Sequence, residues 1–277
     1  MTYEDVLYRV EDGIAVITLN RPDRLNAWRA EMDRDVRAAM KAASSDEAVR
    51  VIVLTGAGRG FCAGADMNNL QSLAGSGGDS GGAPRPRPAA PEPFDASANE
   101  DFKRQYSWFP SVPRPIIAAI NGPCAGLGLI MALYADMRFA SDKAVFTTAF
   151  ARRGLIAEHG VSWLLPRLVG MAHACDLLYS ARTVRAPEAL AMGLVSRVIP
   201  EDQFMSEVMA YARMLATETS PRSMREMKRE MWHAQFQTLA QAIDEANGDM
   251  AGSFASADFK EGVAHFVEKR KPQFTGR

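Results

Sequence analysis

The chain has 277 residues, enough for one large domain or for a domain with a small appendage. Apolar residues make up 47% and charged residues 23%, proportions that exclude a disordered or fibrous chain. Lys and Arg total 32 against 33 for Asp and Glu, so the charge balance does not indicate a general nucleic-acid or membrane-surface binder.

The cysteines and the N-terminus indicate the compartment. Cys62, Cys124 and Cys175 are odd in number and widely spaced, which argues against a disulfide framework or a zinc site. The N-terminal segment MTYEDVLYRV lacks the apolar core of a signal peptide, and the longest apolar stretch, around residues 126–135, is too short to span a bilayer. We therefore expect a cytoplasmic, soluble protein without a bound metal.

Strands and helices are expected to alternate over the first 200 residues or so. Short apolar runs predict strands at 14–19, 51–55, 116–120, 137–140 and 194–199. An apolar stripe on a charged segment predicts an amphipathic helix through Met32, Val36, Met40 and Ala43, and residues 126–134 predict a buried helix. This alternation is typical of an α/β fold with a mainly parallel sheet.

The remainder of the chain differs from this pattern. From about Asp202 only helical periodicity is found, so we divide the chain into a core at 1–200 and a helical C-terminal region at 201–277. Residues 74–95 are rich in Gly, Ser and Pro and predict a flexible insertion.

This insertion contains GDSGG, which matches the nucleophile pattern of serine hydrolases around Ser80. The flanking sequence predicts neither the strand nor the helix that such a nucleophile needs, and all four histidines follow it, so we reject that interpretation.

Two glycine-rich turns follow predicted buried strands. RGFCAGADM (59–67) comes after the strand at 51–55, and NGPCAGLGLIMAL (121–133) comes after the strand at 116–120. The first residues of a helix have unpaired N–H groups that can hold an anion or a developing oxyanion. If the turns converge, one N–H from each forms an oxyanion hole for a carbonyl group. For the first turn the alternative is a tight structural turn.

Five segments in this order resemble the crotonase superfamily, the enoyl-CoA hydratase/isomerase family. They are ITLNRPDRLNAW (17–28), VRVIVLTGAGRGFCAGADM (49–67), PRPIIAAINGPCAGLGLIMAL (113–133), ARTVRAPEALAMGLVSRVIP (181–200) and DFKEGVAHFVEKRKPQF (258–274). The resemblance implies a crotonase-like spiral of ββα units and an enzyme acting on acyl-CoA thioesters. It also implies a helical C-terminal region that assembles a homotrimer or hexamer. Coenzyme A is expected as part of the substrate, with no bound cofactor and no nucleic-acid or membrane partner.

The resemblance also assigns roles to individual residues. The oxyanion donors of the family fall on the main chain of Ala65 and Leu127. Positions that line the CoA groove fall on Arg24, Leu25, Ala27, Ala63 and Asp66. Lys269 and Phe274 match a C-terminal segment that often reaches the CoA of a neighbouring subunit.

The resemblance places the acid-base group at Glu158, in the segment GLIAEHG (154–160). Well-studied hydratases carry two glutamates at positions that here fall on Ile130 and Phe150, neither of which can exchange a proton. Glu158 instead matches the position where single-acid enoyl-CoA isomerases carry their carboxylate, and where dienoyl-CoA isomerases and a dehalogenating relative carry an Asp. One carboxylate suffices to remove a proton and to return it at the other end of a dienolate.

The sequence thus predicts double-bond migration in an enoyl-CoA, with two alternatives. One is hydration of a 2-enoyl-CoA, in which Glu158 alone positions and deprotonates water. The other is a non-catalytic relative that binds CoA or RNA. For Glu158 itself the alternatives are a cap on the helix that starts near Gly160 or a surface position. His159 is a candidate proton relay or a structural residue.

Overall fold

The computed structural model describes residues 2–75, 94 and 98–277. Within these residues the main sheet has six strands in the order β1-β2-β3-β4-β6-β9. They are β1 (Val6–Glu11), β2 (Ile14–Leu19), β3 (Val51–Gly56), β4 (Ile116–Ile120), β6 (Met137–Ser141) and β9 (Arg197–Ile199). Strand β1 is antiparallel to β2, whereas the other neighbours are parallel. The predicted α/β class with a mainly parallel sheet is confirmed.

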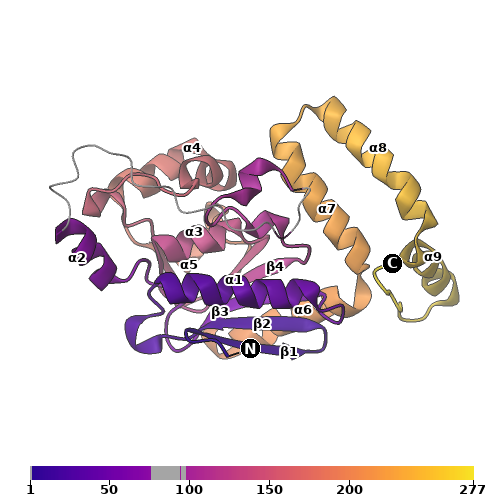
Figure 1. Cartoon of the computed structure of the whole chain (residues 1–277), viewed down its shortest axis with the longest axis horizontal. Coiled ribbons are helices and arrows are strands. Elements are labelled where there is room, and N and C mark those ends of the chain that lie inside the picture. The colour runs from indigo at the N-terminus through magenta and orange to yellow at the C-terminus, as the bar shows by residue number, and fades with distance from the viewer. Residues whose placement is uncertain (1, 76–93, 95–97) are drawn as a thin grey trace.

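Helices α1 (Ala30–Ser45) and α6 (Phe204–Glu218) cover opposite faces of this sheet (Figure 1). Successive side chains of a strand point to opposite faces, so β3 divides its residues between two hydrophobic clusters. Ile52 and Leu54 belong to the cluster of α1, whereas Val51 and Val53 belong to that of α6. The central strands read as continuous apolar runs because both of their faces are covered.

A smaller sheet and several short elements surround the carboxyl ends of the main strands. The small sheet has the order β5 (Cys124–Ala125), β7 (Val145–Thr147) and β8 (Val184–Arg185). The helices of this part are α2 (Met67–Gly75), α3 (Leu127–Tyr134), α4 (Val161–Ser180) and α5 (Ala186–Ala191). The single-turn helices η2 (Glu100–Lys103), η3 (Phe109–Ser111) and η4 (Ala151–Arg153) lie between them in sequence, whereas η1 (Pro22–Arg24) precedes α2 and η5 (Glu201–Gln203) follows α5.

The C-terminal region is helical, as predicted, but its helices lie in two different places. Helix α6 packs on the sheet, and α7 (Pro221–His233) is attached to the core through a buried ion pair. Lys228 Nζ lies 2.8 Å from Asp136 Oδ2 and donates to the Arg114 carbonyl at 3.0 Å. After η6 (Ala234–Phe236), α8 (Leu239–Ala255) and α9 (Ala257–Glu268) form a C-terminal arm that projects from the core (Figure 1).

The structure corrects three details of the prediction. Strand β1 was not predicted, because it is an edge strand whose residues are mostly exposed and partly charged. Strand β9 begins at Arg197 instead of 194, because the Leu194 N–H donates to the Ala189 carbonyl and ends α5. Helix α3 begins at Leu127 because Gly126 has a φ of 49°.

The predicted insertion at 74–95 lies largely outside the described residues, and so does Ser80. Residues 74 and 75 form the end of α2. No helix in the described part of the chain is long and apolar enough to cross a membrane.

Candidate active site

The loops that follow β3 and β4 pack against each other. The N–H groups of Phe61 and Cys62 both donate to the Pro123 carbonyl at 3.1 Å, and the Ala125 N–H donates to the Cys62 carbonyl at 2.9 Å. Because β3 and β4 are parallel neighbours, their carboxyl ends lie at the same edge of the sheet. The two turns therefore converge, which is the condition that the sequence analysis set for an oxyanion hole.

Glycines allow this close approach. Gly64 has a φ of 96°, and a Cβ atom there would lie 3.0 Å from the Ala125 carbonyl oxygen. A Cβ on Gly128 would lie 2.4 Å from the Cys62 carbonyl oxygen, closer than real Cβ atoms come. Larger residues at these positions would push the two turns apart.

Each turn leaves at least one main-chain donor unused. Leu127 is the first residue of α3, so its N–H lies ahead of the intrahelical hydrogen bonds. Ala65 pairs with Trp28 in a short parallel bridge that uses the N–H groups of Trp28 and Asp66 instead of its own. Among the described residues, neither the Ala65 nor the Leu127 N–H donates to an acceptor. A pair of such donors can hold a negatively charged oxygen.

Comparison with known proteins identifies the family. The family model described as "Enoyl-CoA hydratase/isomerase" matches residues 9–277. The chain belongs to the enoyl-CoA hydratase/isomerase family.

Relatives with different activities are equally similar. A 1,2-epoxyphenylacetyl-CoA isomerase of Escherichia coli (strain K12) is 34% identical, and the match covers 99% of both chains. A protein of Rhodobacter capsulatus named probable enoyl-CoA hydratase is 36% identical, with 100% of both chains covered. The crystal structure of an enoyl-CoA hydratase from Bacillus anthracis is 25% identical and covers 99% of this chain and 100% of its own, with a TM-score of 0.84. These relatives confirm the crotonase fold, and the chain is an enzyme of this family.

The residues expected to line the CoA groove of this chain lie together beside the first turn. The Ala63 N–H donates to the Leu25 carbonyl at 2.9 Å, and the Ala27 N–H donates to the Arg24 carbonyl at 3.0 Å. These main-chain contacts join the segment after η1 to the first turn. Their role in CoA binding stays a prediction.

Asp66 is held by Arg21, a residue that the sequence did not single out. Arg21 Nη2 lies 2.8 Å from Asp66 Oδ2, and its Nη1 donates to the Ala27 carbonyl at 2.5 Å. The hydrogen bond from Arg21 lowers the pKa of Asp66 below its ordinary value. Asp66 Oδ1 also accepts from the Asn68 N–H at 3.0 Å, so the carboxylate is fixed at the start of α2. No local pattern distinguishes Arg21 from the other arginines, because its partner lies far along the chain.

Lys269 and Phe274 do not join this group within one chain. The Phe274 carbonyl accepts from Arg50 Nη2 at 3.1 Å, and Arg50 directly precedes β3. The turns follow the opposite end of that strand. Lys269 ends α9 with a φ of 53°. The expected contact of these two residues with the CoA of a neighbouring subunit stays a prediction.

Glu158 lies in the loop between η4 and α4, with 35% of its side chain exposed. Gly160 caps α4 and no side chain bonds to the helix start, so Glu158 does not act as a helix cap. Its Oε2 lies 3.8 Å from His159 Nε2. Burial lowers the pKa of His159, and the neighbouring carboxylate offsets part of this effect. The imidazole is therefore neutral at neutral pH and can either donate or accept a hydrogen bond.

Tyr106 connects the Glu158 loop to the first turn. Its ring centroid lies 4.7 Å from that of His159 and 6.1 Å from that of Trp28, both in edge-to-face contacts. The main chain of Trp28 in turn pairs with Ala65. Burial raises the pKa of Tyr106 well above its ordinary value. The sequence reasoning missed Tyr106, which lies in no recognisable motif.

Ile130 and Phe150 are buried in the main hydrophobic cluster, with exposures of 0% and 5%. They occupy the positions that we matched to the two glutamates of well-studied hydratases. In this chain those positions contribute to packing and carry no acid-base group.

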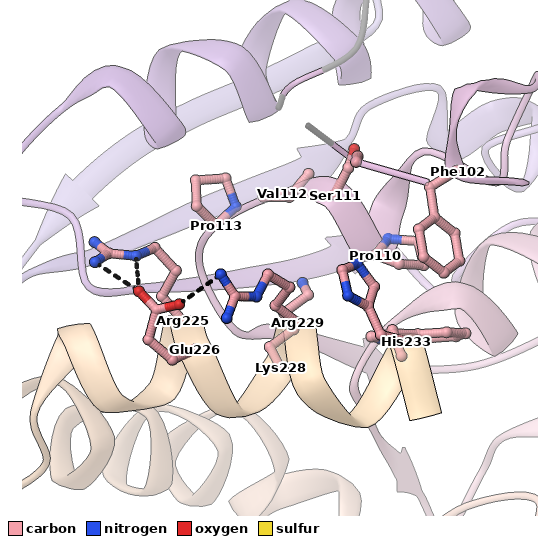
Figure 2. A pocket seen from close by; sticks show the side chains of 12 residues that line it. Phe102, Pro110, Ser111, Val112, Pro113, Arg225, Glu226, Lys228, Arg229 and His233 are labelled. Carbon is pink, nitrogen blue, oxygen red and sulfur yellow. Dashed lines mark hydrogen bonds and ion pairs between the residues drawn. The ribbon is translucent and has the colours of Figure 1, made fainter. Parts of the chain in front are cut away.

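One further cavity lies away from this region, against α7. No group of three or more His, Cys, Asp or Glu side chains among the described residues could hold a metal ion. Figure 2 shows a cavity of about 140 Å³ between α7 and the chain that precedes β4. Three of its charged residues pair with one another: Glu226 lies 3.0 Å from Arg225 and 3.2 Å from Arg229. This cavity contains none of the residues expected at the active site.

Proposed function

We propose that this enzyme moves the double bond of an enoyl-CoA thioester, with coenzyme A arriving as part of the substrate. The observation that carries the proposal is the distribution of carboxylates. Glu158 is a partly exposed acid in a loop tied through His159 and Tyr106 to the first turn, whereas Ile130 and Phe150 are buried and apolar. A single acid-base group suits isomerisation better than the two-carboxylate activation of water.

The proposed reaction begins with the thioester oxygen bound to the N–H groups of Ala65 and Leu127. The Glu158 carboxylate removes a proton from the α carbon of a 3-enoyl-CoA, and negative charge moves to that oxygen as a dienolate forms. Glu158 then returns the proton to the γ carbon, which gives the 2-enoyl-CoA and restores the carboxylate. Loss of one such N–H donor typically costs about 3 kcal/mol of transition-state stabilisation.

Two alternatives remain for the same site. In the first, Glu158 alone deprotonates a water molecule that adds to a 2-enoyl-CoA; the partial exposure of its side chain leaves room for water, and relatives named as hydratases are as similar as the isomerase. In the second, the chain binds acyl-CoA or RNA without turnover.

Replacement of Glu158 by Gln separates these possibilities. We expect Glu158→Gln to lower isomerase activity on 3-enoyl-CoA by roughly 10²- to 10⁴-fold, because it removes the acid-base group and keeps the shape of the side chain. Acyl-CoA affinity, measured by calorimetry, should stay close to that of the parent. Glu201→Gln is the matched control, because it removes an exposed carboxylate from η5.

Full isomerase activity in the Glu158→Gln variant would refute the mechanism. Binding without turnover by both parent and variant would favour the non-catalytic alternative.

We also propose that the C-terminal arm mediates assembly into a homotrimer or hexamer. Helix α8 has no buried residue, and apolar side chains of the arm are at least 44% exposed. These side chains are Leu239, Ile243, Met250, Phe254, Phe259, Val263, Phe266 and Val267. Large apolar side chains exposed in such number usually mark an interface.

Sedimentation analysis tests this assembly. The parent should have the mass of three or six chains of 30.2 kDa. Phe266→Glu, at a position that is 80% exposed, should lower the mass, because a charge is then buried in an apolar contact. Leu7→Glu, on the edge strand β1, should leave it unchanged. A parent that sediments as a single chain would contradict the proposal.

A further inference from the structure

Trp28, Asp33 and Tyr106 form a polar cluster that the reaction above does not use. Trp28 is 3% exposed and Tyr106 is 5% exposed, while Asp33 lies in the first turn of α1 and is partly buried. The Tyr106 ring contacts both Trp28 and His159. The cluster therefore lies between the first turn, which contains Ala65, and the Glu158 loop.

Two buried atoms of this cluster lack a hydrogen-bond partner. They are the indole Nε1 of Trp28, which is a donor, and Oδ1 of Asp33, which is an acceptor. The indole lies near both the Asp33 carboxyl group and the Tyr106 hydroxyl group, although neither contact has the geometry of a hydrogen bond. Buried polar groups without a hydrogen-bond partner are costly and rare in native structures, so two of them in one cluster call for an explanation.

Arg37 influences which ligand this cluster can accept. Its guanidinium lies over the rings of Phe94 and Trp108, 4.9 and 5.1 Å from their centroids. Burial raises the pKa of Asp33, and the charge of Arg37 offsets part of this effect. An oxygen of the Asp33 carboxyl group can accept a hydrogen bond in either protonation state.

We infer that this cluster is a subsite for a hydroxyl group carried by the acyl part of the substrate. A hydroxyl both donates and accepts, so one such group satisfies Trp28 Nε1 and Asp33 Oδ1 together. An ammonium group offers only donors, and a carboxylate or ketone offers only acceptors, so each would leave one buried atom unpaired. The inference rests on the proposed function, because the acyl chain must pass between the Ala65 N–H and Glu158.

Binding of matched thioesters tests the subsite without requiring turnover. The probes are saturated medium-chain acyl-CoA thioesters that carry either no hydroxyl or one hydroxyl at successive carbons. Calorimetry on the full chain should find a hydroxylated thioester that binds roughly 10- to 100-fold more tightly than the plain one, the range expected for a hydrogen bond to a charged group. Equal affinities, within about twofold, for every member of the series would overturn the inference.

Two substitutions test whether Trp28 and Asp33 cause the tighter binding of the hydroxylated thioester. Trp28→Phe removes the donor, and Asp33→Leu removes the acceptor while keeping similar volume; each should bring the affinity ratio of the two thioesters close to unity. Glu31→Gln, which removes a carboxylate elsewhere on α1, is the control and should keep the ratio. Circular dichroism during thermal unfolding checks that each variant is folded.

If the affinity ratio of the two thioesters is unchanged in folded Trp28→Phe and Asp33→Leu variants, the subsite proposal is wrong. The isomerase proposal is not affected by that result. Conversely, a Glu158→Gln variant that keeps both turnover and the hydroxyl preference would refute the proposed mechanism alone. A parent that binds no acyl-CoA would refute both.

Discussion

The two turns and the Glu158 loop contribute to one candidate site through opposite kinds of packing. In the turns, backbone fills the space around the glycines: a Cβ atom on Gly122 would lie 2.0 Å from the Arg59 carbonyl oxygen. Near the start of the loop, a Cβ on Gly154 would meet nothing within 4 Å and Ile156 is 79% exposed, whereas at its end a Cβ on Gly160 would lie 2.5 Å from the Tyr134 hydroxyl. Main-chain donors must be fixed to stabilise charge as it develops, whereas a carboxylate that moves a proton between two carbons needs room.

The largest expected difference between these regions is in stability. Gly122→Ala should lower the free energy of unfolding by roughly 3 kcal/mol or more, because the new methyl group overlaps the Arg59 carbonyl. Gly154→Ala should lower it by only about 1–2 kcal/mol, the cost of a left-handed φ of 67° for a residue with a Cβ atom. Urea denaturation measures both. Equal losses would show that the turns are no more tightly packed than the loop.

The tight packing of the turns should also be measurable as low reactivity of the cysteines that they contain. Burial raises the pKa of Cys62 to about 12 and raises that of Cys124 well above its ordinary value, whereas Cys175 in α4 is only partly buried. Because the thiolate is the reactive form, Cys175 should react with an aromatic disulfide reagent at least about 100-fold faster than the other two at neutral pH. Cys175→Ser should remove the fast phase. Three equal rates in the folded protein would contradict the tight packing of the turns.

The smallest expected effect concerns the proton affinity of His159, which NMR titration measures. Its pKa should lie below the ordinary 6.5, and Glu158→Gln should lower it further, because the carboxylate stabilises the imidazolium. Between the lowered pKa and 6.5, the unfolded chain binds a proton that the folded chain does not. The free energy of unfolding should therefore fall as the pH is lowered through this window. A pKa that rises in Glu158→Gln would mean that the two side chains do not interact.

Much of the fold could be predicted because the central strands are covered on both faces. Strands β2 and β4 coincide with the apolar runs that predicted them, and β3 extends one residue further. Four strands were not predicted: the edge strand β1 and the short strands β5, β7 and β8. The edge strand presents charged residues to solvent, and two- or three-residue strands are too short for a periodic pattern.

The candidate site was predictable only where it depends on local motifs. The motifs placed the turns of Ala65 and Leu127, and parallel strand order explains why those turns meet. Arg21 contacts Asp66 and Tyr106 contacts Trp28, and in each pair the two residues are distant in sequence. No local sequence pattern therefore predicts these contacts. Helix capping by Glu158 was an open alternative that the structure excludes, because Gly160 caps α4.

Product analysis of the unmodified enzyme tests the isomerase proposal most directly. The enzyme is incubated separately with a 3-enoyl-CoA and with the 2-enoyl-CoA of the same chain length, and the thioesters are separated and identified by mass. We expect each substrate to give the other isomer, with no product that has gained the mass of water. Conversion of the 2-enoyl-CoA mainly to a 3-hydroxyacyl-CoA would contradict the proposal and would show that Glu158 activates water.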